Sequence, residues 1–532
     1  MSWAGSSRKT DIRFEWSENN PSFGPLLYMG LFRTRTTAVF GIDAHLIDVE
    51  VDLYQSGSAR DFITVGMPDM AVRESRERIK SALMNSGFGY PAKAVTINLA
   101  PANVRKEGAG FDLPMALGIL GATGALKASD HHAFTGELSL DGTLRPVRGA
   151  LSMAVCARRN GLRYLVLPKE NAPEAAVVEG LHVLGVRHLA EAVAALRAPD
   201  DFSAEHPAAD AESLDDIPDF ADVRGQTTAK RACEVAAAGG HNVLLVGPPG
   251  SGKTMLASRL AGILPPLDFA EALEATQIHS VAGQLKAGAG LLRRRPFRAP
   301  HHTVSDAGLI GGGSGVPRPG EASLAHNGVL FLDELPEFAR NVLEQLRQPL
   351  EEGVVAIARA SGTMRFPARF MLIAAMNPCP CGYFGDAGRE CRCTGAIIQR
   401  YLGKISGPLL DRIDLHVEVP AVPFKDLRAK DTGVTSGAMR ERVLRARETQ
   451  KARGFVNAVI PPSAVRALCA LDEAGERTLE LAMRKMGLSA RAHDRLLKVA
   501  RTVADLDNSP RVLSKHLAEA IQYRSLDRSY WG

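Results

Sequence analysis

The chain has 532 residues, of which 45% are hydrophobic and 23% are charged, and its formal net charge is +5. At roughly 100–200 residues per domain, this length predicts three or four domains. The small positive charge permits an acidic partner without requiring one. Seven cysteines in so long a chain do not suggest a secreted disulfide scaffold, and no apolar run approaches the roughly 18–20 residues of a membrane helix. We therefore expect a cytoplasmic globular protein without a signal peptide or a membrane partner.

The N-terminal third begins with polar and aromatic residues that follow no hydrophobic period. We expect residues 1–28 to form a disordered extension, and Met29 is an alternative start. Residues 29–198 mix strands and helices: alternation predicts strands at 44–53 and 94–100, and helical spacing predicts a helix at 71–87. The Asp-Gly pair in 136–147 predicts a hairpin turn.

An acidic stretch separates this region from the next. Residues 199–219 hold eight Asp or Glu, three Pro and no Lys or Arg, which is typical of a linker. Residues 220–420 form a second patterned region, and 421–532 form a third that is rich in helical spacing. Within it, 425–453 has nine Lys or Arg against four Asp or Glu, which indicates either a solvated helix face or a nucleic-acid contact.

A phosphate-binding loop lies between an apolar strand at 241–246 and helical residues at 255–263. Glycines in such a loop let backbone N–H groups approach phosphates, and the helix N-terminus adds a favourable dipole. Lys253 is expected to place its charge on the β- and γ-phosphates, and Thr254 to offer a hydroxyl to Mg²⁺. The loop consists of Gly247, Pro248, Pro249, Gly250, Ser251, Gly252, Lys253 and Thr254.

Two further apolar strands end in polar side chains. The strand at 328–334 ends in Asp333 and Glu334, which suit Mg²⁺ binding and polarisation of the attacking water, respectively. Such a pair can also be a helix N-cap, but a complete phosphate loop earlier in the chain favours the hydrolytic role. The strand at 370–377 ends in Asn377, which we expect beside the γ-phosphate; the alternative is a turn residue.

The order of these three motifs resembles that of the AAA+ ATPases. Five further segments resemble the magnesium-chelatase-related branch: 222–226, 296–303, 319–328, 377–382 and 406–414. From about Leu31 onward, the whole chain is similar to the ComM/YifB group of bacterial proteins. The resemblance implies an α/β protein with an N-terminal Lon-protease-like α+β domain, a central AAA+ parallel-sheet domain that binds ATP and Mg²⁺, and a C-terminal helical lid domain.

The resemblance also assigns roles to single residues. Arg412 matches the arginine finger that reaches a neighbouring subunit's ATP, which implies a homo-hexameric ring. The alternative is a surface arginine paired with Asp411 or Asp414. Arg491 matches the second sensor on the lid, with Arg495 as the competing choice. Residues 223–226 are expected near the adenine.

Basic residues in two inserts are candidates for DNA contact. Lys and Arg neutralise a sugar-phosphate backbone without reading its sequence, although these arginines can equally be ordinary surface charges. The ComM/YifB group, which this chain resembles, is associated with a DNA helicase that promotes branch migration in natural transformation. The alternative is a protein-remodelling chaperone of the magnesium-chelatase type. The candidates are Arg293, Arg294, Arg295 and Arg298 in the insert 284–325, and Arg359 and Arg365 in an expected hairpin at 353–366.

Two other features bear on activity. The segment 106–115 resembles the nucleophile region of Lon proteases, but it contains no Ser, so we expect a non-proteolytic scaffold. Two close cysteine pairs suit a tetrahedral Zn²⁺ site, although one residue within each pair is a tighter spacing than usual. Reduced loop cysteines without metal are the alternative. The pairs are Cys379 with Cys381, and Cys391 with Cys393.

Overall fold

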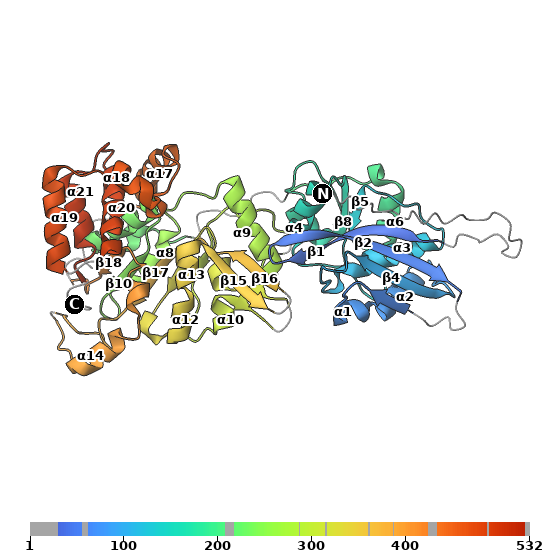
Figure 1. Cartoon of the computed structure of the whole chain (residues 1–532), viewed down its shortest axis with the longest axis horizontal. Helices are drawn as coiled ribbons and strands as arrows, with labels where there is room; N and C mark the ends of the chain where they lie inside the picture. The colour runs from blue at the N-terminus through green and yellow to red at the C-terminus, as the bar shows by residue number, and fades with distance from the viewer. Residues whose placement is uncertain are drawn as a thin grey trace, which may run out of the picture.

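The computed structural model is elongated, with the N-terminal domain at one end and the central domain at the other, where the C-terminal helices pack against it (Figure 1). The predicted disordered extension lies outside the described residues. The structure describes residues 30–55, 62–207, 217–286, 288–313, 316–359, 362–386, 388–423, 433–486 and 489–526.

The N-terminal domain is built on two sheets. The larger has the order β1-β2-β4-β3, and the smaller is the parallel sheet β5-β8-β9. Its strands are β1 (Phe32–Phe40), β2 (Asp43–Tyr54), β3 (Phe62–Val65), β4 (Ala94–Ala100), β5 (His132–Phe134), β6 (Glu137–Leu138), β7 (Leu144–Arg145), β8 (Tyr164–Pro168) and β9 (His182–Val186). Its helices are α1 (Met70–Arg73), α2 (Ser75–Asn85), α3 (Asp112–Ala122), α4 (Ala150–Arg159), α5 (Ala172–Ala175) and α6 (Leu189–Arg197).

Helix α3 lies directly on the larger sheet because its glycines leave room for strand side chains. A Cβ atom at Gly121 would stand 2.3 Å from the Phe32 ring, and one at Gly118 would stand 2.6 Å from Val51. The predicted hairpin is confirmed: β6 pairs antiparallel with β7, and Gly142 has φ +90° at the turn. This backbone is accessible to glycine at little cost.

The central domain is organised by a parallel sheet with the order β11-β14-β17-β10-β18. Its strands are β10 (Val243–Val246), β11 (Phe297–Arg298), β14 (Val329–Leu332), β17 (Met371–Met376) and β18 (Leu415–Glu418). Its helices are α7 (Thr227–Gly239), α8 (Lys253–Leu260), α9 (Phe269–Ala282), α10 (Asp306–Leu309), α11 (Glu321–Leu324), α12 (Arg340–Gln345), α13 (Arg347–Glu352), α14 (Gly395–Leu402) and α15 (Gly407–Leu410). Two antiparallel pairs stand apart from the sheet, β12 (Gly311–Gly312) with β13 (Arg318–Pro319), and β15 (Val354–Arg359) with β16 (Gly362–Pro367). The second pair is the hairpin predicted at 353–366.

Alternate residues of each central strand enter two different cores. Val243 and Leu245 pack with α7 and α8 on one face of the sheet, whereas Leu244 and Val246 pack with α12 and α14 on the other. A parallel sheet covered by helices on both faces needs strands that are apolar at every position. All four residues of β10 and of β14 are accordingly buried.

The lid shares the core formed by α7 and α8. Its helices are α17 (Ser436–Ala452), α18 (Pro462–Leu468), α19 (Glu473–Met486), α20 (Ala490–Leu506) and α21 (Ser514–Gln522). A buried polar network adds to this apolar contact. Asp414, after α15, contacts His241 Nδ1 at 3.3 Å and accepts from Arg495 of α20 at 2.8 Å, and His241 Nε2 lies 2.8 Å from Thr502 Oγ1.

The acidic stretch 199–219 is in contact with its neighbours at both ends. Tyr164 donates to Asp200 at 3.0 Å, while the Asp219 carboxylate accepts from the backbone N–H of Ser436 at 3.0 Å. Residues 208–216 lie outside the described part, and for them the linker stays a prediction. Among the described helices, none is both long enough and apolar enough to span a bilayer.

The Asp414 network predicts a large loss of stability on Asp414→Ala. Breaking a buried pair leaves Arg495 and His241 uncompensated, which costs about 3 kcal/mol, and a lowered thermal unfolding midpoint of the full chain measures the loss. Burial acts to raise the pKa of Asp414, but the hydrogen bond with His241 and the charge of Arg495 outweigh it and lower the pKa to about 2. Asp has a pKa of about 3.9 in an unfolded chain, so Asp414→Ala should show its complete loss of stability above that pH. The loss should disappear as the pH falls toward 2.

The matched control is Glu473→Ala, since this carboxylate is 82% exposed and pairs with Arg477 on the surface of α19. An exposed pair of this kind is worth about 0–1 kcal/mol. Equal midpoints for the two variants would contradict a structural role for the network.

Candidate nucleotide-binding site

Three neighbouring strands of the central sheet deliver the predicted site residues to one edge. In the order β14-β17-β10, each strand runs parallel to the next. Their carboxyl ends are followed by Asp333 and Glu334, by Asn377, and by the phosphate loop. The crevice outside these strand ends is where parallel α/β sheets bind ligands.

Lys253 connects two of the three segments. Its Nζ donates to the carbonyl oxygens of Gly247 at 2.7 Å and Pro248 at 2.9 Å, and to Asn377 Oδ1 at 3.2 Å. Burial lowers the pKa of Lys253, while the charges of Asp333 and Glu334 act to raise it. The predicted lysine and the predicted strand-end asparagine therefore meet at one point.

The loop itself has the shape of an anion cradle. Gly250 and Gly252 have φ of +76° and +95°, and a Cβ built on either would meet no atom within 4 Å, so their backbone is open on that side. At Gly247 a Cβ would stand 2.0 Å from the Val419 carbonyl oxygen, so only glycine fits there. The Ser251 hydroxyl is buried and has no hydrogen-bond partner among the described residues. These features suit a phosphate group held by backbone N–H groups at the start of α8.

Thr254 and Asp333 connect the remaining segment. The Thr254 hydroxyl donates to Asp333 Oδ2 at 2.7 Å, and Asp333 Oδ1 accepts from the backbone N–H of Glu334 at 2.9 Å. A hydroxyl beside a carboxylate is the kind of oxygen set that Mg²⁺ accepts together with waters and phosphates. The residues present therefore fit the metal that the sequence analysis expects.

Glu334 has a contact that sequence reasoning missed. Its backbone is left-handed, with φ +54° and ψ +46°, and its carboxylate lies 3.4 Å from His302 Nδ1. His302 belongs to the segment 296–303, which resembles the magnesium-chelatase branch but carries no predicted role. The sequence does contain one signal for this contact, which is a histidine shortly after β11, the strand next to β14.

The segment expected near the adenine touches the phosphate loop. Gln226 Nε2 donates to the carbonyl oxygens of Ser251 at 3.1 Å and Pro420 at 2.6 Å. A cavity of about 540 Å³ is lined by Val223 and Gly225 together with residues of α7 and α17. A nucleotide base placed against 223–226 would thus adjoin both the loop and the lid.

The two lid arginines lie in different environments. Arg491 is exposed on the first turn of α20, whereas Arg495 is bonded to Asp414. Arg495 is thus engaged with Asp414, and the sensor role of Arg491 stays a prediction. Arg412 is only 5% exposed, and its guanidinium bonds to Glu351 and to the Pro408 carbonyl oxygen. A surface pairing with Asp411 or Asp414 therefore does not describe Arg412, whereas its role as an arginine finger toward a neighbouring subunit stays a prediction.

Two of the six arginines predicted to contact DNA need correction. Arg295 forms a bidentate ion pair with Glu271 and also donates to the Asn327 carbonyl oxygen. Arg298 forms a bidentate ion pair with Glu321. Their charges are paired with carboxylates inside the domain, which contradicts the prediction that these two arginines are free to contact DNA.

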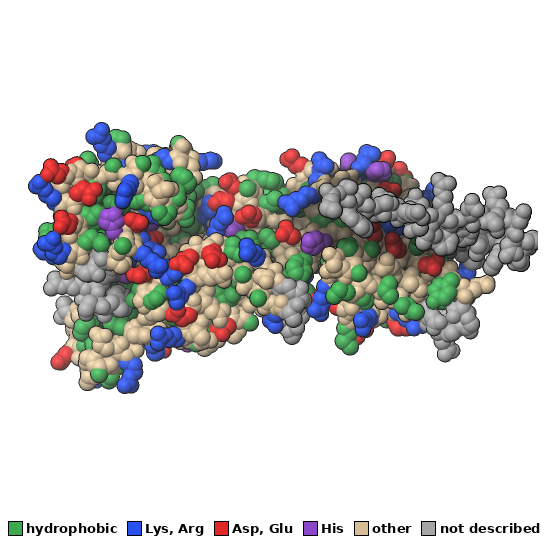
Figure 2. Space-filling view, viewed as in Figure 1, with side chains coloured by type: hydrophobic (Ala, Val, Ile, Leu, Met, Phe, Trp, Pro, Cys, Tyr) green, Lys and Arg blue, Asp and Glu red, His purple; other side chains and the backbone are tan. Residues whose placement is uncertain are grey.

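The other four arginines lie in two places. Arg293 and Arg294 line a cavity of about 470 Å³ beside α8 and α17. Arg359 and Arg365 are exposed on the β15–β16 hairpin, where Arg359 donates to the Gly313 carbonyl oxygen at 2.8 Å. On the face seen in Figure 2, basic and acidic side chains are interspersed, and no continuous basic stripe is visible.

The four clustered cysteines converge on one point. Their sulfur atoms all lie within 4.8 Å of one another, with separations of 3.3–3.7 Å among Cys379, Cys381 and Cys391. Tetrahedral zinc with Zn–S bonds near 2.3 Å separates its sulfur ligands by about 3.8 Å. The loop that carries the cluster lies against the phosphate loop, because a Cβ on Gly382 would stand 2.5 Å from the Pro249 ring.

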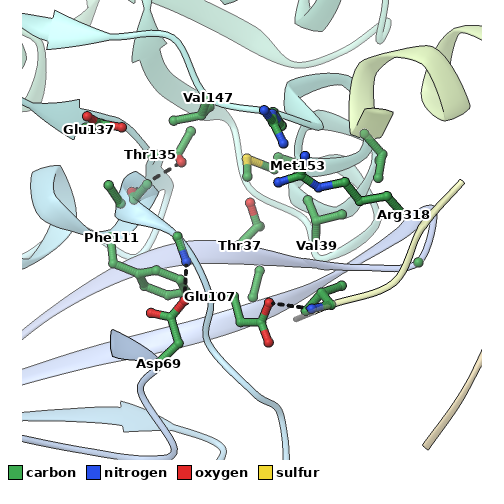
Figure 3. A pocket seen from close by; sticks show the side chains of 18 of the residues that line it. Thr37, Val39, Asp69, Glu107, Phe111, Thr135, Glu137, Val147, Met153 and Arg318 are labelled. Atoms are coloured by element: carbon green, nitrogen blue, oxygen red, sulfur yellow. Dashed lines mark hydrogen bonds between the residues drawn. The ribbon is translucent and has the colours of Figure 1, made fainter. Parts of the chain in front are cut away.

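A third cavity, of about 920 Å³, lies between the N-terminal domain and the insert of the ATPase domain. Figure 3 shows Thr37 near its middle, Phe111 and Thr135 on one side, and Arg318 of the insert on the other. The loop 108–111, which resembles the Lon nucleophile region, forms part of its wall. Its described lining contains no Ser, Lys or His, so it lacks the pair that serine–lysine proteolysis requires.

Comparisons with known proteins agree with this architecture. Family models of the magnesium chelatase subunit ChlI match residues 219–427 and 49–171, and a model of its C-terminal part matches 433–524. Competence protein ComM of Haemophilus influenzae and YifB of Escherichia coli are each 44% identical to this chain, over 94% of its length and 98% of theirs. A Lon protease of Roseiflexus castenholzii is 30% identical over 104 residues, which are 20% of this chain and 13% of that protein. The predicted fold class is therefore confirmed, with a Lon-like N-terminal domain, and the chain belongs to the ComM/YifB family of magnesium-chelatase-like AAA+ proteins.

Proposed function

We propose that the protein is an ATP-hydrolysing motor whose site lies at the carboxyl ends of β10, β17 and β14. The observation that carries the proposal is the pair of contacts between Lys253 and Asn377 and between Thr254 and Asp333. Four side chains from three segments thereby meet at one edge of the sheet. Family membership supports the same ATPase class.

The roles of the residues follow from their chemistry. The loop backbone and Lys253 bind the β- and γ-phosphates, and Thr254 with Asp333 holds Mg²⁺, which supplies positive charge to the phosphate oxygens when bound. Glu334 accepts a proton from the attacking water, and Asn377 orients that water. Because catalysis of phosphoryl transfer is mostly positioning and charge stabilisation, small displacements of these groups slow the reaction strongly.

The proposed roles predict different defects for two variants: Lys253→Ala should lose ATP binding, and Glu334→Gln should lose turnover. Lys253→Ala removes the charge that faces the phosphates, so ATP affinity should fall at least tenfold. Glu334→Gln preserves shape but removes the proton acceptor, so kcat should fall at least 100-fold while ATP still binds. Nucleotide titration and steady-state hydrolysis of the full chain distinguish the two; near-normal turnover by Glu334→Gln would refute the assignment.

The working unit under this proposal is a ring of identical subunits, with six as the expected number. Arg412, on the segment after α15, would contribute to the ATP of the adjacent subunit. To do so, its guanidinium must exchange Glu351 for a phosphate oxygen. An arginine supplied in this way is worth about 10³–10⁵ in rate in related phosphoryl-transfer enzymes.

The substrate we propose is branched or single-stranded DNA, on which the motor drives branch migration. Support comes from a relative named competence protein ComM and from Arg359 and Arg365, which are exposed on a hairpin. On the register of β15 and β16, Arg365 pairs with Ala356 and Arg359 with Gly362. The two arginines thus occupy opposite faces of the hairpin, and both are exposed.

Branch migration of a synthetic three-stranded DNA tests the proposal directly. The wild-type protein should move the branch point in the presence of ATP, and Lys253→Ala should not. The double variant Arg359→Ala/Arg365→Ala should weaken DNA binding and reduce the slope of log affinity against log salt by about 2, because each phosphate contact contributes about 0.9.

A matched control removes two arginines elsewhere. Arg477 and Arg484 on α19 are 76% and 78% exposed, and their double alanine variant should leave the salt slope unchanged. If branched DNA neither binds nor stimulates hydrolysis, the helicase proposal fails, and remodelling of a partner protein becomes the function to pursue.

We further propose that Cys379, Cys381, Cys391 and Cys393 hold one structural Zn²⁺. Backbone N–H groups of Tyr383 and Arg392 hydrogen-bond to Cys381 and lower the pKa of its thiol to about 6, whereas burial and the neighbouring thiols raise the pKa of Cys391 and Cys393. Cys381 is thus the member of the cluster that most readily forms the thiolate that zinc binds. Metal analysis of the purified chain should find one zinc per subunit, and Cys381→Ser should lose it. Cys156→Ser, at a buried cysteine outside the cluster, should keep it; equal metal content in all three proteins would refute the site.

A further inference from the structure

The carboxylate of Glu334 is held by little besides His302. Its side chain is 57% exposed, and the His302 imidazole at 3.4 Å is the side chain in contact with it among the described residues. A flexible carboxylate that must face one water molecule needs a partner to select its rotamer. The backbone of Glu334 is also left-handed, a conformation that non-glycine residues adopt mainly where the surrounding structure enforces it.

His302, in contrast, is fixed from two sides. The His301 ring stands 4.0 Å away between centroids, and the edge of Phe338 meets the His302 ring at 6.4 Å and 77°. Phe338 is 3% exposed and belongs to the core beneath the sheet. A turn closed by the Val304 N–H on the His301 carbonyl oxygen at 2.9 Å holds the two histidines together. The imidazole is therefore positioned by packing that does not depend on Glu334.

The place of His302 in the sheet explains why it reaches this carboxylate. Strand β11 ends at Arg298 and pairs parallel with β14, with Arg298 opposite Leu330. The chain then continues beyond the same edge at which β14 delivers Glu334. Two adjacent parallel strands thus end side by side, and the residues after them face each other.

We infer that His302 is a positioning residue that sets the Glu334 carboxylate toward the attacking water. This inference rests on the proposed role of Glu334 in ATP hydrolysis. Among the contacts of the described residues, His302 touches neither the phosphate loop nor Asp333, so its loss should affect turnover and not nucleotide binding. The atom that matters is Nδ1, since that nitrogen faces the carboxylate.

The test is a series of substitutions at His302 in the full chain, assayed for ATP hydrolysis with Mg²⁺. His302→Ala should lower kcat about tenfold or more, with KM and nucleotide affinity within about twofold of wild type. The amide of Asn can place a donor close to the position of Nδ1, whereas that of Gln reaches the position of Nε2. His302→Asn should therefore restore kcat to within about threefold of wild type, and His302→Gln should behave like the alanine variant.

Two control variants establish whether the loss of turnover is specific to the contact between His302 and Glu334. His182→Ala removes an exposed imidazole on β9 of the N-terminal domain, and it should keep kcat within about twofold. Adding His302→Ala to Glu334→Gln should lower the residual rate no further, because the group that His302 positions is already disabled.

The outcomes distinguish the role of Glu334 from that of His302. If Glu334→Gln hydrolyses ATP normally, the proposed role of Glu334 is wrong. If Glu334→Gln is inactive while His302→Ala turns over normally, or if Asn restores no more activity than Gln, the positioning role of His302 is wrong. A His302→Ala variant that loses nucleotide affinity along with kcat would likewise overturn it.

Discussion

The parallel order β11-β14-β17-β10-β18 is the constraint on which the site depends. Parallel strands end at the same edge, so segments far apart in the chain deliver their polar ends to one crevice. Lys253 meets Asn377 across 124 residues, and Thr254 meets Asp333 across 79. His302 joins them because β11 is the next strand outward. Any change that shifted one strand by two residues would separate these pairs, whatever side chains it kept.

The strands and the phosphate loop could be predicted because their signals are local. Continuous apolar runs at 243–246, 329–332 and 371–376 indicate buried parallel strands, and the glycine pattern after the first has one main structural meaning. The cysteine cluster was visible for the same reason, since its four residues lie within 15 positions of one another.

Side-chain partners were harder to predict, because they depend on which elements become neighbours. The sequence alone suggests that Arg295 and Arg298 are unpaired charges in a basic insert. In the structure, Arg295 pairs with Glu271 of α9, and Arg298 pairs with Glu321 of α11. Arg412 is paired with Glu351, which lies 61 residues earlier. The signal for His302, a histidine shortly after the strand next to β14, has meaning only once the strand order is known. In each case the contact cannot be predicted from the spacing of the residues along the chain, because it depends on which elements pack together.

The same strand order has a consequence for synthesis on the ribosome. Asn242, at the start of β10, bonds to Leu372 and Asp414, which lie 130 and 172 residues further along the chain. The sheets of the N-terminal domain, by contrast, are complete by Val186. Because domains fold as units from the N-terminus, this domain can fold before β17 and β18, the two strands that pair with β10, have been synthesised. The phosphate loop is thus made well before β17 and β18, the strands that complete its surroundings.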